Sequence, residues 1–297
     1  MQKIIVEKNN IRIDTYISTV LNISRSKVAK LNIKVNGSEV KSSYLVKEND
    51  IIEIDYIEET FNVEPEKMDL DIVHEDDDII VVNKANGIVT HPAIGNIRGT
   101  LVNGLMYHSK SLSKINGEFR PGIVHRLDAY TTGLLVVAKN DKAHEFLAKE
   151  LENKTLKRKY IALVWGVINN DTGTIDAPIG RDLKDRKKMA VTSINSKEAI
   201  THFKVLERLL NATLIEVELV TGRTHQIRVH MNYIGYPIVN DNVYGKGKII
   251  DNTGQCLHAK ELGLIHPKTK EEMTFVCELP ECFNNILVEV QNGKNDK

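Results

Sequence analysis

Apolar and polar residues in the first sixty positions follow a helical spacing and then the alternation of strands. The apolar positions spaced for one face of a helix are Ile13, Ile17, Val20 and Leu21. A second, shorter helix is expected over residues 25–31, with Ser24 as its N-cap. Strands are expected over residues 33–35 and 51–54, and the Asn-Gly pair at residues 36–37 is typical of a hairpin turn. The pattern predicts a small α+β unit.

The rest of the chain alternates short apolar strands with amphipathic helices. Strands are expected over residues 79–82, 134–138, 160–166, 199–206 and 214–220, helices over 141–151 and 225–234, and a hairpin over 257–279. In the third of these strands, the period of two places Tyr160 on one face with Ala162 and Val164. Thr224 can cap the second helix, which is expected to stop before Gly235.

The pattern divides the chain into four parts. Residues 1–61 form the small unit, and residues 62–71, which contain Pro65, several charges and little apolar periodicity, are typical of a linker. Residues 72–285 hold the strands and helices of a larger domain, and residues 286–297 are expected to form a C-terminal tail. A chain of 297 residues is long enough for two unequal units that each bury a core.

Asp128 breaks the local preferences of a buried strand. The sequence His-Arg-Leu-Asp at residues 125–128 leads through Thr-Thr-Gly at residues 131–133 into the apolar run 134–138. Strands disfavour Asp and Gly, and such departures concentrate at functional sites. We therefore take Asp128 as the candidate functional residue, held between a histidine and an arginine as cations. The alternative is that it only stabilises a turn before the strand.

The composition is that of a globular protein, and its formal net charge is zero. Of the residues, 41% are apolar and 27% charged, and 40 Lys and Arg balance 40 Asp and Glu, which counts against nucleic-acid binding. Local exceptions are the basic runs 154–159 and 181–188 and the cations Arg25, Lys27 and Lys30 of the second predicted helix. Local patches can bind phosphates, although a solvated surface is the simpler explanation of any single run.

The chain carries no recognisable targeting, membrane or metal signal. The first twenty residues hold too many charges for a secretory signal, and the longest apolar run, 161–168, is too short to span a bilayer, so we expect a cytoplasmic protein. The three cysteines form no CxxC or zinc pattern and are expected to be reduced. His225 and His230 are five residues apart rather than the four of a zinc helix, so no metal site is expected.

The small unit resembles an RNA-binding module that occurs in a small-subunit ribosomal protein and in tyrosyl-tRNA synthetases. The resemblance rests on Arg-Ile-Asp at residues 12–14, Ser-Arg-Ser at 24–26 and Val-Asn-Gly at 35–37. It implies that the basic residues of the second helix bind RNA. One departure is the short link 31–33 before the hairpin, where the family has a Gly and several more residues. A purely structural cap on the larger domain is the alternative.

Four ordered motifs of the larger domain resemble those of RNA pseudouridine synthases, in the branch of the large-subunit ribosomal RNA and tRNA enzymes. The motifs occupy residues 83–92, 125–135, 159–162 and 222–230. Ala85 departs from the pattern, which usually has Pro after the Lys of the first motif. The resemblance implies an α+β fold with a mixed, largely antiparallel central sheet, flanking helices and a cleft.

The resemblance also implies a reaction. A uridine in RNA loses its glycosidic bond to nitrogen, the uracil turns within the site, and a carbon–carbon bond to the same ribose forms; because no redox change occurs, no cofactor is expected. Asp128 would attack the anomeric carbon or remove the ribose 2′ proton. Arg228, expected on the polar side of its helix, would keep that carboxylate ionised. Tyr160 would stack under the base.

Further residues are assigned to RNA by the same resemblance. Arg126 matches the residue that holds the distorted RNA while the target base leaves its stack. Arg223, Lys157 and Arg158 would contact phosphates, with plain surface charge as the alternative. His125 belongs to the same RNA-binding set.

Two other classes of protein stay open. An N-glycosidase that releases the base would share the Asp but usually needs a second carboxylate to activate water, and none lies near Asp128 in the motif. A non-catalytic RNA-binding or ribosome-assembly factor would need only the small unit and the basic patches. We expect an enzyme that acts as a monomer on RNA, with ribosomal RNA favoured over transfer RNA.

Overall fold

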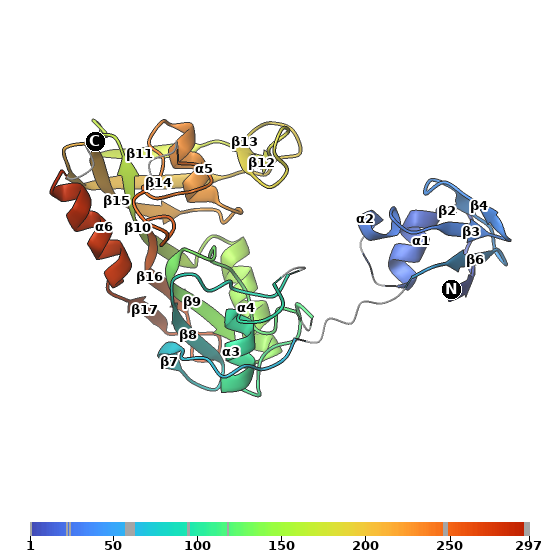
Figure 1. The fold of residues 1–297 in the computed structure, drawn as a ribbon. Helices are drawn as coiled ribbons and strands as arrows, with labels where there is room; N and C mark the ends of the chain where they lie inside the picture. Colours follow the sequence, from blue (N-terminus) through green and yellow to red (C-terminus); the bar gives the residue numbers. More distant parts are fainter. Residues whose placement is uncertain are drawn as a thin grey trace. The chain divides into compact units, whose positions relative to one another are not determined.

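The computed structural model describes residues 2–21, 23, 25–56, 63–93, 96–117, 119–245 and 249–293. The chain forms two compact units, Met1–Asn62 and Val63–Lys297 (Figure 1). Each unit has a hydrophobic core of its own. Ser24, the predicted N-cap, and residues 57–62, where the predicted linker begins, lie outside the described residues.

The first unit combines two short helices with a small sheet. The helices are α1 (Ile13–Val20) and α2 (Arg25–Val28), the sheet has the order β1 (Gln2–Ile5), β6 (Ile51–Ile54), β3 (Ile33–Val35) and β4 (Ser38–Glu39), and β2 (Ile11–Arg12) pairs with β5 (Leu45–Val46). Val35 pairs with Ser38, and Asn36 and Gly37 between them have the positive φ angles of a two-residue hairpin turn. The hairpin prediction is confirmed, whereas the second helix ends at Val28 instead of continuing to residue 31.

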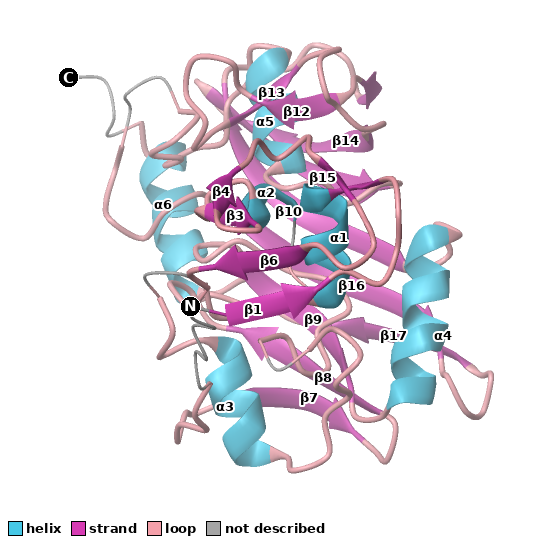
Figure 2. Ribbon diagram, turned by 90° about the vertical axis from the view of Figure 1, so that its right-hand side faces the viewer, coloured by secondary structure: helices cyan, strands magenta, loops and turns pink. Residues whose placement is uncertain are grey.

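A sheet of nine strands runs through the described part of the second unit (Figure 2). Its order is β11 (Thr172–Asp176), β14 (Ile200–Arg208), β15 (Ala212–Leu219), β10 (Lys157–Trp165), β16 (Leu257–Ile265), β9 (Thr132–Ala138), β8 (Ile79–Lys84) and β7 (Asp71–Glu75), with β17 (Glu272–Val276) paired to β16. Strands β16 and β9 pair in parallel, and the other pairs described in this sheet are antiparallel. The predicted α+β fold with a mixed, largely antiparallel sheet is confirmed.

Helices pack on both faces of this sheet. They are α3 (Leu101–His108), α4 (Asp141–Glu152), α5 (Gln226–Tyr233) and α6 (Glu281–Gln291), and a small hairpin of β12 (Ile179–Arg181) and β13 (Met189–Val191) lies outside the sheet. Tyr160, Ala162 and Val164 of β10 share one core with residues of α3 and α5. Ile161 and Leu163 pack with α6 on the opposite face, as the period of two predicted.

Some predicted boundaries differ from the structure. Helix α6 continues to Gln291 with Ile286 and Val290 buried, so the first residues of the predicted tail 286–297 belong to the packed unit. Val63 lies in the large core, so residues near the predicted linker 62–71 are also packed. These tertiary contacts bury single apolar residues that lie within polar stretches of sequence. Periodicity alone does not show that such residues are buried. In the described residues, no helix is long and apolar enough to cross a membrane.

Candidate active site

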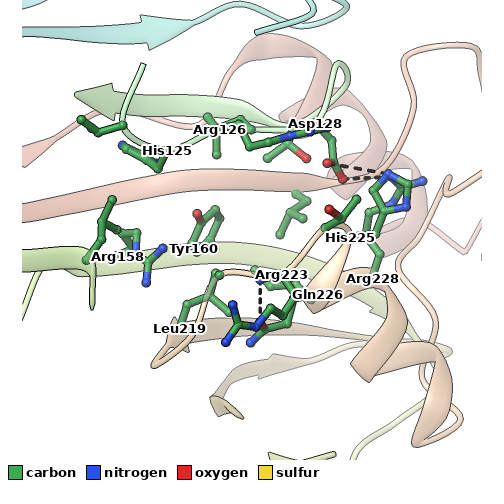
Figure 3. Close-up of a pocket in the computed structure, with 18 of the residues that line it drawn as sticks. His125, Arg126, Asp128, Arg158, Tyr160, Leu219, Arg223, His225, Gln226 and Arg228 are labelled. Carbon is green, nitrogen blue, oxygen red and sulfur yellow. Dashed lines mark hydrogen bonds and ion pairs between the residues drawn. The ribbon is translucent and has the colours of Figure 1, made fainter. Parts of the chain in front are cut away.

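A pocket of about 370 Å³ lies on the sheet face that α5 covers (Figure 3). The turn before β9, strand β10, the loop between β15 and α5, and the first turn of α5 form its walls. The predicted site residues that line it are Asp128, Tyr160, Arg228, His125, Arg126, Arg158 and Arg223. Lys157 does not line this pocket, and Arg25, Lys27 and Lys30 belong to the first unit.

Asp128 forms an ion pair with Arg228 inside the pocket. Nη1 of Arg228 donates to Oδ2 of Asp128 over 2.9 Å. The turn before β9 is closed by the backbone, because Thr131 N–H donates to the Asp128 carbonyl. The turn therefore exists, as the alternative explanation of Asp128 required, but its closure leaves the carboxylate side chain directed toward α5.

Arg228 is shared between two carboxylates. Its Nε and Nη2 donate to the two oxygens of Asp241 over 2.6 and 2.9 Å, while Nη1 serves Asp128. Asp241 is fully buried, and its Oδ1 also accepts the backbone N–H groups of Val243 and Tyr244. This bidentate pair fixes the plane of the guanidinium and thus the position from which Nη1 meets Asp128.

The electrostatics keep this network charged. Burial opposes ionisation of Asp241, but hydrogen bonds from Arg228 and from backbone N–H groups outweigh it and lower the pKa of Asp241. Burial likewise opposes the charge on Arg228, and its hydrogen bonds and proximity to the two carboxylates raise the pKa of Arg228 above its ordinary value. Arg228 is only 4% exposed, so the polar side of the helix, which it shares with His225, faces Asp128 inside the pocket and not the solvent.

His225 stands at the start of α5 in a left-handed conformation, with φ at +56°. Its Nδ1 is 2.8 Å from the hydroxyl of Tyr244, and its Nε2 is 3.8 Å from Oδ1 of Asp128. Burial lowers the pKa of His225, and the charge of Asp128 opposes this effect. Because His225 and not Thr224 occupies the N-cap position, the predicted cap is wrong; the backbone is instead turned so that the imidazole faces Asp128.

Tyr160 and His125 occupy the part of the pocket away from Arg228 in Figure 3. Tyr160 is 5% exposed, and burial raises the pKa of its hydroxyl. His125 accepts the N–H of Val136 through Nε2, and burial followed by the charge of Arg158 lowers the pKa of His125 to about 3. The prediction that His125 flanks Asp128 as a cation is wrong, because this ring is neutral at pH 7.

Lys84 fastens the Asp128 turn to the neighbouring loop. Its ammonium group, 1% exposed, donates to the carbonyls of Ala85, Ile88 and Ala129 over 2.8–3.0 Å. Burial lowers the pKa of Lys84 to about 7, and the charge of Asp128 opposes this shift. The sequence placed Lys84 within the first motif, residues 83–92, but did not reveal its role as the anchor of the residue next to Asp128.

The cations assigned to RNA lie in different surroundings. Arg126 is exposed at the pocket rim, and Arg223 donates from Nε to the carbonyl of Glu198 over 2.8 Å. Lys157 is exposed on β10, beside Gly263 of the next strand. In the first unit, Arg25 forms a 2.9 Å ion pair with Asp14, Lys27 lies over the ring of Tyr56, and Lys30 is exposed.

Within the described residues, one group could hold a metal ion: Asp76, Asp78 and His266. His266 accepts backbone N–H groups of Lys268 and Thr269 at Nδ1, so its Nε2 carries the proton and donates to Asp76 over 3.1 Å. His74 also lies 2.8 Å from the same Asp76 oxygen. Asp76 is thus bonded to both histidines, the carboxylate of Asp78 accepts a hydrogen bond from Asn140, and none of these residues lines the pocket around Asp128.

Two residues of this network were missed from the sequence. Asp241 stands between Asn240 and Asn242, Tyr244 comes three residues later, and nothing local separates them from ordinary loop residues. Their placement depends on contacts across 13 and 19 residues, with Arg228 and His225 respectively. The polar run of residues 240–242 is typical of an exposed loop, so the sequence carries no local signal that this Asp is buried.

The pocket combines a carboxylate held by a buried arginine with an aromatic side chain and a rim of cations. The carboxylate can perform covalent or proton-transfer chemistry, the aromatic ring can stack on a planar ring, and the cations can hold an anionic polymer. The fold and this site define the class as an enzyme acting on nucleic acid. Comparison with known proteins narrows the class.

The sequence profile of the family described as RNA pseudouridylate synthase matches residues 78–233. The chain is 53% identical over 287 residues, 95% of this chain and 94% of the relative, to a protein of Bacillus subtilis (strain 168) named "Uncharacterized RNA pseudouridine synthase YlyB". It is 44% identical over 243 residues, 77% of this chain and 76% of the relative, to "Ribosomal large subunit pseudouridine synthase D" of Zymomonas mobilis.

A similar solved structure is "Human RNA Pseudouridylate Synthase Domain Containing 1", with a TM-score of 0.59, 25% sequence identity, and coverage of 75% of this chain and 94% of that chain. The chain belongs to the RNA pseudouridylate synthase family, and the predicted enzyme class is confirmed.

Proposed function

We propose that this enzyme isomerises specific uridines of large-subunit ribosomal RNA to pseudouridine, with Asp128 as its catalytic carboxylate. The choice of ribosomal RNA rests on relatives that carry the name of a large-subunit enzyme, such as the one from Zymomonas mobilis. Transfer RNA is the other candidate. An RNA substrate of either kind supports a cytoplasmic enzyme, and we further propose that it acts as a monomer.

The first half of the reaction breaks the bond between uracil N1 and ribose C1′. Asp128 either adds to C1′ or takes the 2′ proton, and both routes need an ionised carboxylate. Arg228 supplies the opposing charge at 2.9 Å. Because Arg228 also satisfies Asp241, it leaves Asp128 ionised without neutralising it fully. In the second half, C5 bonds to C1′ as the C1′–Asp128 bond breaks or as the 2′ proton returns to the sugar. The C5 proton then leaves and N1 gains a proton, so no cofactor is needed.

The remaining pocket residues hold the nucleotide. Tyr160 stacks under the uracil, a contact worth on the order of 1–3 kcal/mol. The target base must leave its stack in the RNA, which costs a few kcal/mol. Arg126, at the rim of the pocket, holds the RNA strand in this distorted conformation. Arg223 and Lys157 contact phosphates. His125, being neutral, contributes a polar wall rather than a counter-charge.

The first unit binds RNA outside the target nucleotide. Its exposed cations Arg25, Lys27 and Lys30 supply the positive charge, although the ion pair of Arg25 with Asp14 reduces its share. A variant with Lys27 and Lys30 replaced by Gln is expected to bind RNA more weakly and with a shallower salt dependence, while catalysis at saturating RNA is retained. An unchanged salt slope would contradict RNA binding by this unit.

The observation that carries the proposal is the ion pair of Asp128 with Arg228 inside the pocket. The decisive experiment compares the wild type with Asp128→Asn on ribosomal RNA labelled with tritium at uracil C5. The variant is expected to release no tritium and to bind RNA with nearly the wild-type affinity, because the two side chains are isosteric. Tritium release by the variant would refute the role of Asp128.

The same assay separates the other protein classes. An N-glycosidase would produce free uracil, whereas an isomerase leaves the base attached to the chain. A second carboxylate, Asp241, is present in the network, but both of its oxygens already accept hydrogen bonds, so it is poorly suited to activate water. A pure RNA-binding factor would release no tritium even as the wild type. Mapping pseudouridines in a strain lacking this protein identifies the uridine.

A further inference from the structure

Arg158 is a buried cation without a partner. Its residue is 7% exposed, and its Nε is fully buried with no hydrogen-bond partner. Across the described residues, neither a hydrogen bond nor an ion pair reaches its guanidinium, and because Nε alone of the three nitrogens is fully buried, the two Nη groups are accessible from the pocket. Leaving a buried charge uncompensated is costly, so proteins rarely retain one unless a ligand supplies the missing partner. This residue is therefore built for an anionic ligand.

The position of Arg158 identifies where that negative charge arises. It stands on β10 two residues before Tyr160, and both side chains line the pocket. Figure 3 shows Arg158 beside Tyr160 and His125, whereas Asp128 and Arg228 lie at the other end. The charge of Arg158 acts on both neighbours, lowering the pKa of His125 and opposing the rise in that of Tyr160. Arg158 thus lies beside the ring that stacks on the base.

The backbone opposite Arg158 is adapted to it. A Cβ added at Gly222 would lie 2.8 Å from Nη1 of Arg158, too close for any ordinary contact. The φ angle of Gly222 is not in the left-handed region, so its backbone conformation does not require glycine. The absence of a side chain at this position gives the guanidinium its room against the loop between β15 and α5.

We propose that Arg158 stabilises the negative charge that develops on the uracil ring when its glycosidic bond breaks. This inference rests on the proposed function. As the N1–C1′ bond breaks, its electron pair stays with the base and spreads over N1, O2 and O4. The guanidinium donates N–H groups to this anion and transfers no proton, while Asp128 bonds to C1′ or takes the 2′ proton. The ring then supplies the electron pair of the C5–C1′ bond, as the C1′–Asp128 bond breaks or the 2′ proton returns. C5 loses its proton, and N1 gains one from solvent.

A buried cation of this kind differs from a phosphate contact. Phosphates of an RNA strand stay at the solvent side of a pocket, where exposed cations such as Arg126 meet them. Arg158 lies within the wall, where a fixed positive charge favours the transition state more than the neutral uridine. The sequence analysis placed Arg158 with the phosphate contacts, and the structure gives it a different environment from Lys157, which is exposed.

Arg158→Met tests the inference through catalysis, binding and stability together. We expect kcat to fall by about 100-fold, as for loss of one stabilising donor to a developing anion, with RNA affinity within a factor of a few of the wild type. Removing an unpaired buried charge is also expected to leave the free energy of unfolding unchanged or raised. The control Arg98→Met, which removes an exposed arginine paired with Glu64, should change none of these quantities.

A substrate with a better leaving group sharpens the test. Fluorine at C5 stabilises the uracil anion, so the enzyme needs less help from Arg158. In single-turnover cleavage of the N1–C1′ bond, the defect of Arg158→Met is expected to be clearly smaller with 5-fluorouridine RNA than with uridine RNA. An equal defect with both substrates would overturn the inference.

Gly222→Ala provides a second variant that keeps the arginine. Its methyl group displaces the guanidinium, so kcat should fall, and this loss should vanish in the Arg158→Met background. A wild-type value of kcat in Arg158→Met would reject the inference. A loss confined to RNA affinity would reject it in favour of a phosphate contact, and a marked loss of stability would reject it in favour of a structural role. None of these results would affect the Asp128→Asn test of the proposed function.

Discussion

Arg228 joins Asp128 by a 2.9 Å hydrogen bond between residues 100 positions apart in sequence. The bond connects the turn before β9 with the first turns of α5, so the candidate site exists only in the folded unit. Its geometry depends on a third residue, Asp241, which occupies the other two donating nitrogens of the guanidinium. Stability and activity are therefore linked at this arginine.

Replacing Arg228 should lower both the stability and the activity of the protein, and a second substitution should separate the two effects. Arg228→Met leaves Asp241 buried and unpaired, which is expected to cost about 3–5 kcal/mol of unfolding free energy. Adding Asp241→Asn removes the unpaired charge and keeps an oxygen that accepts the N–H groups of Val243 and Tyr244, so stability should recover while activity stays lost, because Asp128 still lacks its cation. Denaturant titration and tritium release measure the two effects. Recovery of activity in the double variant would contradict the role of the ion pair.

Lys84 is the next residue whose loss should act on Asp128 indirectly. Lys84→Met leaves the carbonyls of Ala85, Ile88 and Ala129 without their donor, and we expect a loss of about 2–4 kcal/mol in unfolding free energy. Because Ala129 follows Asp128, kcat of the folded protein should fall as well. The control is Lys139→Met, because Lys139 lies outside the pocket. This variant loses the hydrogen bonds from Lys139 to the Asp76 carbonyl and to the Glu75 carboxylate, but its kcat should be unchanged.

The sequence predicted the parts of this site that local rules govern. The alternation in β10 placed Tyr160 on the correct face, and the departure from strand preference singled out Asp128. The resemblance paired Asp128 with Arg228, and the structure brings them into contact. Asp241 could not be anticipated, because its role depends on the distance between a loop and a helix that periodicity does not encode.

Charge states were the least predictable feature, because they depend on burial. His125 looks like a cation in the sequence but is neutral, since it is partly buried, lies near the charge of Arg158 and accepts a backbone hydrogen bond. Arg158 looks like one cation among several in a basic run, yet it is the buried and unpaired one. The neighbours of these two residues in sequence do not determine whether each side chain is exposed or buried. Only the fold determines this.

His125 should make the protein sensitive to acid. In the unfolded chain it binds a proton below its ordinary pKa of 6.5, whereas in the folded protein it stays neutral down to about 3. Between these values the unfolded state holds more protons, so the free energy of unfolding falls as pH falls, by up to about 1.4 kcal/mol per pH unit from this group. His125→Gln, which can still accept the Val136 N–H, should flatten this slope between pH 6 and 4. Parallel curves for the two proteins would refute the prediction.

Gly133 should be the residue of the Asp128 turn that tolerates a side chain least. Its φ is +106°, and a Cβ there would collide with the backbone of Ala259, at the parallel pairing of β9 with β16. Gly133→Ala therefore combines backbone strain with an overlap that rigid strands cannot relieve, and we expect a loss of about 3 kcal/mol or more in unfolding free energy.

Gly117 offers the matched control for this substitution. It also has a positive φ, +76°, but nothing lies within 4 Å of its added Cβ, so Gly117→Ala should cost only the backbone term of about 1–2 kcal/mol. Denaturant titration of both variants compares the two losses directly. Gly133→Ala should additionally lower kcat in the folded fraction, because widening the β9–β16 pairing moves the turn that carries Asp128. Equal losses of stability in the two variants would show that overlap of the added Cβ with the backbone of Ala259 plays no part.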